Sequence, residues 1–115
     1  MLGSLIFALS VAVTFDDLPA AGPDRSGTEA IVSINRSIVG TLTKRHIPAV
    51  GFVNEIGLET NGGVDPARVA ALKTWLDHGL TLGNHTYSHP SLHKVTREVY
   101  LDVESTVAPA TGAPA

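Results

Sequence analysis

Two pairs of side chains in this sequence have the types and spacing that metal-assisted hydrolysis requires. Asp16 and Asp17 are adjacent after a β-rich run, and His85 and His89 are separated by three residues. One carboxylate can bind a metal ion while its neighbour takes a proton from a water molecule. Imidazoles four residues apart lie on one face of a helical turn, so both can reach one ion. Two histidines and one aspartate leave coordination positions open for water and substrate, which is typical of catalytic metal sites.

Each pair also has a plainer interpretation. Adjacent aspartates often do no more than begin a loop, where one of them caps the turn. An H-x-x-x-H pair in isolation is a weak signal for a metal site. The pattern around the remaining candidates favours structural roles: helix ends for His46 and His78, the core for Trp75, a solvated loop for Glu55 and packing beneath the histidine loop for Tyr87.

The composition restricts the classes of partner. A chain of 115 residues suits one domain, and 43% apolar with 17% charged residues allows a hydrophobic core. The net charge of -3 gives no basic field for nucleic acid and argues against attraction to anionic membranes. Asp16 interrupts the apolar N-terminal stretch too early for a stable membrane span. Because the chain lacks cysteine, a metal ion must take nitrogen and oxygen ligands; Zn²⁺ is the first expectation, and Co²⁺ or another divalent ion is the alternative.

Periodicity and turn residues predict the elements that must position these side chains. Strands are expected at about 11–15, 47–53 and 80–82. Helices are expected at about 28–44, 66–76 and 96–104. The order β-α-β-α-β-α predicts a parallel sheet with right-handed crossovers. Ligands sit beyond the carboxyl ends of strands in such sheets, so both candidate pairs are expected on one rim.

The two ends of the chain have separate expectations. Residues 1–10 are almost all apolar or small, and they fit either the apolar region of a signal peptide or the start of a strand. No Lys or Arg precedes Leu5, so a buried strand from about Val11 is favoured. A secreted or periplasmic location is favoured over a cytoplasmic one. Residues 107–115 are low in complexity and are expected to form a disordered tail, which leaves 11–106 as the domain.

Both motifs resemble those of the NodB-homology polysaccharide deacetylases, carbohydrate esterase family 4. Residues 11–19, VAVTFDDLP, resemble the first family motif, T-F-D-D. Residues 82–90, LGNHTYSHP, resemble the second motif, H-[S/T]-x-x-H, and residues 47–53 are similar to the strand between them. The resemblance extends over roughly residues 11 to 100 and implies a distorted (β/α) barrel.

The resemblance also implies a role for each matching residue. Asp16 is the general base, and Asp17, His85 and His89 are the metal ligands. Thr86 stands at the Ser/Thr position of the second motif and is expected to order the histidine loop by hydrogen bonding. The implied reaction is hydrolysis of an N-acetyl or O-acetyl group, with an acetylated carbohydrate as the substrate.

The sequence departs from the family pattern after the second motif. Family members carry an Arg-Pro motif, an Asp-Trp segment and a Leu-x-His that supplies the general acid, and none follows His89. His93 is the only later histidine and is too close to the metal motif to replace that acid. Three βα units cannot close a barrel. The chain is therefore expected to be a truncated, N-terminal β-α-β-α-β-α portion of a NodB-type barrel. A catalytically inactive metal- or sugar-binding fragment is the alternative to an active enzyme.

Overall fold

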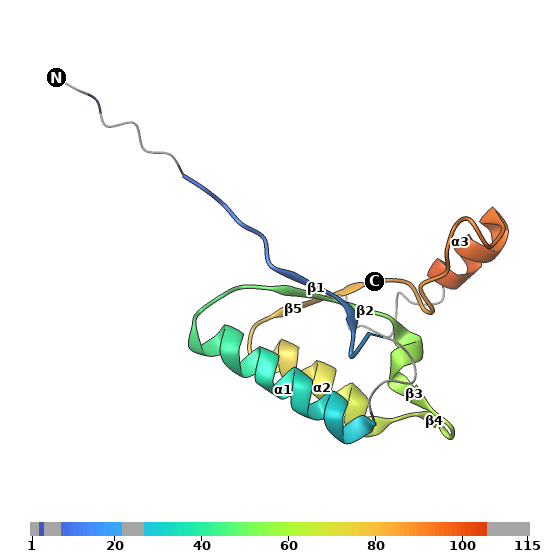
Figure 1. Cartoon of the computed structure of the whole chain (residues 1–115), viewed down its shortest axis with the longest axis horizontal. Helices are drawn as coiled ribbons and strands as arrows, with labels where there is room; N and C mark the ends of the chain where they lie inside the picture. Colours follow the sequence, from blue (N-terminus) through green and yellow to red (C-terminus); the bar gives the residue numbers. More distant parts are fainter. Residues whose placement is uncertain (1–2, 4–7, 22–26, 106–115) are drawn as a thin grey trace.

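A parallel α/β arrangement organises the part of the chain that the computed structural model describes, which is residues 3, 8–21 and 27–105 (Figure 1). The strands are β1 (Thr14–Leu18), β2 (Val50–Val53), β3 (Glu59–Thr60), β4 (Gly63–Val64) and β5 (Thr81–Asn84). The helices are α1 (Thr28–Lys44), α2 (Pro66–Asp77) and α3 (Arg97–Ser105), with one 3₁₀ turn, η1 (Glu55–Leu58). The expected β-α-β-α-β-α order is confirmed, and η1 and the β3–β4 hairpin interrupt it between β2 and α2.

The main sheet has three strands in the order β1-β2-β5, and both pairs are parallel. Helices α1 and α2 pack against each other and lie on the same side of this sheet (Figure 1). Strands in sequential order with their helices on one side are what repeated right-handed βα units produce. The predicted parallel sheet is therefore confirmed, and its carboxyl ends form one rim.

Local signals in the sequence set the helix boundaries. Helix α1 has the predicted bounds of 28–44, and its buried positions recur at helical spacing: Ile31, Asn35, Val39 and Leu42. Helix α2 begins as predicted, because the Asp65 carboxylate accepts a hydrogen bond of 2.9 Å from the Ala67 amide and Pro66 takes the first position. Gly79 ends this segment with a φ of +77°, a conformation that glycine adopts without strain.

The core lies between the sheet and the two helices. Trp75 is fully buried, which confirms its predicted core position. Its ring packs edge-on against the Phe15 ring, with the ring centroids 5.5 Å apart. The indole Nε1 donates a hydrogen bond of 2.9 Å to Oδ1 of the buried Asn35. The Asn35 amide nitrogen donates to the carbonyl oxygens of Pro19 and Ile31 at 2.8 and 2.9 Å. This polar link joins α2, α1 and the end of β1 inside an otherwise apolar core.

Several boundaries differ from the prediction. Strand β1 begins at Thr14 instead of residue 11, and β2 begins at Val50 instead of residue 47. Pro48 has no amide hydrogen for a sheet ladder, and the Ile47 amide bonds to the Leu42 carbonyl at 3.0 Å, which turns this segment back toward α1.

Parts of the predicted ends lie outside the described residues. Most of segment 1–10 and all of the expected tail 107–115 fall there. None of the described helices combines the length and apolar character needed to cross a bilayer.

Candidate metal centre

A bulge in β1 sets the direction of the two aspartates. The sequence predicts that Asp16 and Asp17 follow the strand, but both lie within β1. Phe15 pairs with Gly51 and Leu18 with Val53, so β1 has one more residue between these pairs than β2 has. The extra residue lets Phe15 and Leu18 both pack on the helix side, although residues three apart in a regular strand face opposite sides.

Asp17 adopts a left-handed conformation within this bulge, with a φ of +61°. Aspartate tolerates this region better than most residues other than glycine. Asp17 Oδ1 lies 3.4 Å from His85 Nε2 and 3.8 Å from His89 Nε2. The ligand atoms of these three residues all lie within 4.8 Å of one another. The structure therefore brings together the three residues that the sequence predicts as metal ligands.

The chemistry of this cluster fits a divalent ion. Asp17 Oδ1 is buried and has no hydrogen-bond partner within the described part of the chain. A buried oxygen without a partner needs a proton donor or a cation. Metal–ligand bonds of about 2.0–2.2 Å in tetrahedral geometry place ligand atoms roughly 3.3–3.6 Å apart, close to the observed aspartate–imidazole distances. Two nitrogen donors and one oxygen donor suit Zn²⁺ and related divalent ions.

The two histidines approach each other through a loop and not through a helical turn, so that part of the prediction is wrong. Residues 85–90 follow β5 without helical structure, and Thr86 and His89 have φ values of +68° and +52°. These left-handed residues curl the loop so that the imidazole rings of His85 and His89 meet edge-on, with centroids 4.8 Å apart. Asn84, the last residue of β5, and residues 85–90 together form the histidine loop.

Side chains within and beside the histidine loop hold this curl. The Thr86 hydroxyl accepts a hydrogen bond of 2.9 Å from the His89 amide, which confirms its predicted ordering role. Asn84 Oδ1 accepts from the Thr86 amide at 2.6 Å. Asn54, which is buried at the end of β2, donates from Nδ2 to the carbonyl oxygens of His85 and Thr86. Asn54 directly follows β2 and therefore lies on the rim, but its contact with the loop depends on the neighbouring strand β5.

The η1 turn supports the other side of the histidine loop. The Ile56 amide donates to the Tyr87 carbonyl at 3.0 Å, and the Tyr87 hydroxyl donates to Glu59 Oε1 at 2.7 Å. This second bond raises the pKa of Tyr87, because a carboxylate accepts from the neutral phenol and opposes its ionisation. Tyr87 thus joins the loop to η1 and β3, which is more specific than the predicted packing beneath the loop.

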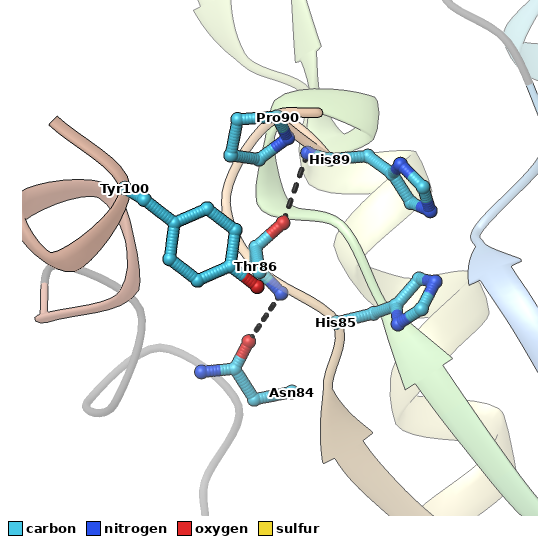
Figure 2. Close-up of a pocket in the computed structure, with 6 residues that line it drawn as sticks. All are labelled: Asn84, His85, Thr86, His89, Pro90 and Tyr100. Atoms are coloured by element: carbon cyan, nitrogen blue, oxygen red, sulfur yellow. Dashed lines mark hydrogen bonds between the residues drawn. The ribbon is translucent and has the colours of Figure 1, made fainter. Parts of the chain in front are cut away.

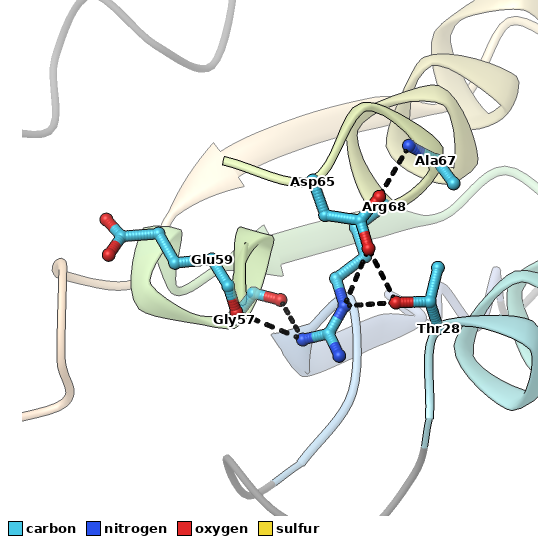
Figure 3. Close-up of polar contacts among 6 residues, drawn as sticks. All are labelled: Thr28, Gly57, Glu59, Asp65, Ala67 and Arg68. Atoms are coloured by element: carbon cyan, nitrogen blue, oxygen red, sulfur yellow. Dashed lines mark hydrogen bonds and ion pairs between the residues drawn. The ribbon is translucent and has the colours of Figure 1, made fainter. Parts of the chain in front are cut away.

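A buried arginine fixes η1 in turn (Figure 3). Arg68 on α2 donates from Nη1 to the carbonyl oxygens of Gly57 and Glu59, at 3.0 and 3.4 Å. Its Nε donates to the Thr28 hydroxyl at 3.1 Å, and that hydroxyl donates to Asp65 at 2.6 Å. The hydrogen bonds from Thr28 and from the backbone hold the pKa of Asp65 below its usual range. The first turns of α1 and α2 thereby anchor the segment that contacts the histidine loop.

Two cavities adjoin the histidines. One has a volume of about 370 Å³ and lies between the histidine loop and α3 (Figure 2), lined by Asn84, His85, Thr86, His89, Pro90 and Tyr100. The other has a volume of about 230 Å³ and is lined by Asp17, Ala20, Asn54, Ile56, Gly57, Ser88 and His89. The second cavity has both Asp17 and His89 in its lining and therefore opens onto the cluster, whereas in Figure 2 Tyr100 lies on the opposite side of the histidine loop from the imidazole rings.

Two acidic residues on the rim have other surroundings. Asp16 occupies an exposed position of β1 next to Asp17. Glu55 is half-buried and faces a separate apolar cavity between η1 and α2, instead of being a solvated loop residue as predicted. Burial and the neighbouring Glu59 raise the pKa of Glu55. Glu55 therefore does not belong to the metal cluster.

A family described as polysaccharide deacetylase matches residues 8–108, which include both aspartates and the whole histidine loop. Comparisons with curated proteins and with solved structures gave no significant match. The matched range covers most of the chain, so the family relationship is carried by the same segments that build the cluster.

Proposed function

Because this chain belongs to the polysaccharide deacetylase family, we propose that it is a metal-dependent hydrolase that removes N- or O-acetyl groups from a carbohydrate. The family supports a carbohydrate deacetylase that hydrolyses carbon–nitrogen bonds other than peptide bonds. The observation that carries metal dependence is the position of Asp17 Oδ1, which is buried, lacks a hydrogen-bond partner among the described residues and faces two imidazole nitrogens.

In this proposal Asp17, His85 and His89 hold a divalent ion, with Zn²⁺ as the first choice. The bound ion would polarise the acetyl carbonyl and lower the pKa of a water molecule. Asp16 is the general base: its exposed position beside Asp17 lets it take a proton from the attacking water. The oxygen of that water would then add to the acetyl carbon, the bond from this carbon to the sugar nitrogen or oxygen would break, and the proton taken by Asp16 would pass to the leaving group, which gives acetate and the deacetylated sugar.

The surrounding residues keep these groups in place. Asn54 and Thr86 fix the backbone of the histidine loop, so the imidazoles keep their orientation without a metal ion. The β1 bulge turns Asp17 toward them. Such preorganisation lowers the free energy that ordering the site would otherwise require on binding.

We further propose that the three-stranded sheet is the N-terminal portion of a distorted (β/α) barrel, with residues 11–106 as a partial domain. Sequential parallel strands with α1 and α2 on one side support this arrangement. The side of the sheet opposite these helices would then line the inside of the barrel. An acetylated carbohydrate outside the cytoplasm, in a secreted or periplasmic setting, is the proposed substrate.

Metal content of the purified chain tests the ligand set. We expect one divalent ion for each chain, and less than a tenth of that in Asp17→Ala and in His85→Ala. His93→Ala is the matched control, because this exposed histidine lies four residues beyond His89 and outside the cluster. Full metal content in both ligand variants would refute the assignment.

A second candidate is a metal- or sugar-binding protein without turnover. It is favoured by one observation: the cluster within the described residues contains no histidine besides His85 and His89 that could protonate the leaving group. Turnover of an acetylated chito-oligosaccharide by the zinc-loaded chain decides between the two. Acetate release that Asp16→Asn abolishes would exclude the binding-only function; no release from a metal-loaded chain would exclude the enzyme.

A further inference from the structure

The apolar cavity between η1 and α2 is a groove on the helix side of the sheet, named the α2 groove below. Its volume is about 420 Å³, and its lining includes Val64, Val69, Leu76 and Leu82. Within the described residues β5 pairs only with β2, so α2 covers the helix side of this edge strand from one direction. Val64, Val69 and Leu76 are 63%, 41% and 47% exposed. Exposed apolar side chains gathered in one groove are typical of a surface that binds another protein element.

The charged groups of the α2 groove are unevenly matched. Glu55 and Glu59 both line it, and Glu55 Oε1 is buried without a hydrogen-bond partner among the described residues. Lys73 also lines the groove, but its ammonium group already pairs with Asp77 at 2.8 Å. A buried carboxylate oxygen of this kind is stabilised by a donor that carries positive charge. The groove therefore suits an apolar segment with a basic residue close to its apolar side chains.

Helix α3 carries such a combination on one of its faces. Arg97 and Leu101 are four residues apart and therefore lie on the same side of the helix, one turn from each other. Both are exposed, Leu101 at 51%, and the ion pairs of the described residues do not include Arg97. A cation in the first turn opposes the helix dipole, so Arg97 gains from a carboxylate partner more than a central residue does. Tyr100 faces the histidine loop instead, which leaves the Arg97–Leu101 face open.

We propose that the α2 groove binds α3 of a second copy of this chain, so that two copies form a reciprocal dimer. Leu101 of each copy packs on the apolar side chains of the other groove, and the Arg97 guanidinium donates to Glu55. In Figure 1, α3 lies apart from the core, at the same end of the long axis as the β3–β4 hairpin that borders the groove. A projecting helix and a groove at one end of a molecule can engage each other around a two-fold axis. The dimer goes beyond the proposed deacetylase function and does not depend on it.

Sedimentation equilibrium of the whole 115-residue chain, from micromolar to millimolar concentration, tests the dimer. We expect the mass to rise toward twice that of a monomer. Leu101→Asp and Leu76→Asp should each raise the dimer Kd about tenfold or more, because a carboxylate would be buried in the apolar groove. Val99→Asp and Ile34→Asp are the matched controls: these residues are 49% and 44% exposed, Val99 on the opposite side of α3 from Leu101 and Ile34 on α1 outside the groove. Both controls should stay within about twofold of the wild type.

Exchanging the charges tests the ion pair separately. Arg97→Glu should weaken the dimer, because it places a carboxylate against Glu55 and Glu59 of the other copy. Adding Glu55→Arg to the same chain should restore the affinity, since the pair is then present with reversed signs. Failure of the second substitution to restore any affinity would remove Glu55 as the partner of Arg97 and overturn this arrangement.

Disulfide cross-linking identifies the occupant of the groove, because the chain has no cysteine of its own. Leu101→Cys and Leu76→Cys chains, mixed and oxidised, should form a disulfide between the two variants, detected by mass spectrometry. A chain carrying both substitutions that closes the disulfide within itself at low concentration would show α3 in its own groove and overturn the dimer. A monomer at every concentration, or a dimer that Leu101→Asp leaves intact, would also overturn it. Circular dichroism checks that each variant is folded, and Leu101→Asp on the peripheral helix decides the test if Leu76→Asp unfolds.

Discussion

Replacing Asn54 with alanine tests how strongly the backbone of the histidine loop controls metal affinity. Asn54 is 7% exposed, and its amide donates to the carbonyl oxygens of His85 and Thr86. The substitution removes the amide group that donates both hydrogen bonds, so these two carbonyl oxygens of the loop lose their bonds to the end of β2. Each hydrogen bond contributes about 1 kcal/mol, so the ordered conformation of the loop loses about 1–3 kcal/mol of stabilising free energy in total.

The loss should appear mainly in metal binding, because without Asn54 the metal-free loop can leave the conformation that metal binding then has to restore. If about 1.4 kcal/mol falls on the bound form, Kd for Zn²⁺ rises about tenfold. Outer groups that orient metal ligands commonly change metal affinity by about 10- to 100-fold. The rise in Tm on adding zinc should shrink by roughly 4–6 °C, because stabilisation follows the ratio of zinc concentration to Kd.

Competition with a chromophoric chelator gives Kd, and thermal unfolding with and without zinc gives the shift in Tm. Asn61→Ala is the control, because it removes an exposed amide from the turn between β3 and β4. Equal zinc affinity for Asn54→Ala and the wild type would refute the reasoning. A fall in Tm that is the same with and without zinc would show that Asn54 stabilises the fold and not the metal-bound loop.

Three further substitutions test the contacts that shape the site. Gly51→Ala should destabilise the chain by about 1–3 kcal/mol in urea titration, because the new methyl group overlaps the Leu18 side chain beside the bulge. Asn35→Ala should lower the free energy of unfolding by about 1–3 kcal/mol for each buried group left unpaired, the Trp75 indole nitrogen first. Asp65→Asn should make the free energy of unfolding depend less on pH in the acid range. The hydrogen bond from Thr28 keeps the pKa of Asp65 low in the folded chain. The stabilisation by the ionised carboxylate is therefore present at neutral pH and is lost as the pH falls through the folded pKa. Unfolding at pH 7 and pH 3 checks this, and an unchanged slope contradicts it.

The elements that depend on local signals could be predicted from the sequence. Helix α1 has the predicted bounds, because the helical spacing of its apolar residues and the charged residues near its ends are signals that act over only a few residues of sequence. The start of α2 follows from Asp65 and Pro66 for the same reason. Residues 61–63, Asn-Gly-Gly, indicate a turn but not the two-residue strands β3 and β4, because these strands are stabilised by pairing with each other and by the hydrogen bond from Arg68 on α2 to the Glu59 carbonyl.

The identities of the candidate ligands also came from the sequence. Asp17, His85 and His89 were predicted from residue type, spacing and family resemblance, and the βα order placed them on one rim. Their metal-binding role and the role of Asp16 as base stay predictions. The residue types determine which chemistry is available, because the two motifs contain two carboxylates, Asp16 and Asp17, and two imidazoles, His85 and His89.

Tertiary structure alone decided how those groups meet. The β1 bulge exists because Phe15 and Leu18 must both reach the core beneath Gly51 and Val53, a constraint set by pairing with β2. The left-handed curl of the histidine loop likewise depends on donors from Asn54 and η1, which lie far away in the sequence. Sequence patterns specify local conformation and chemistry, whereas the directions of side chains at the rim result from contacts between separate strands.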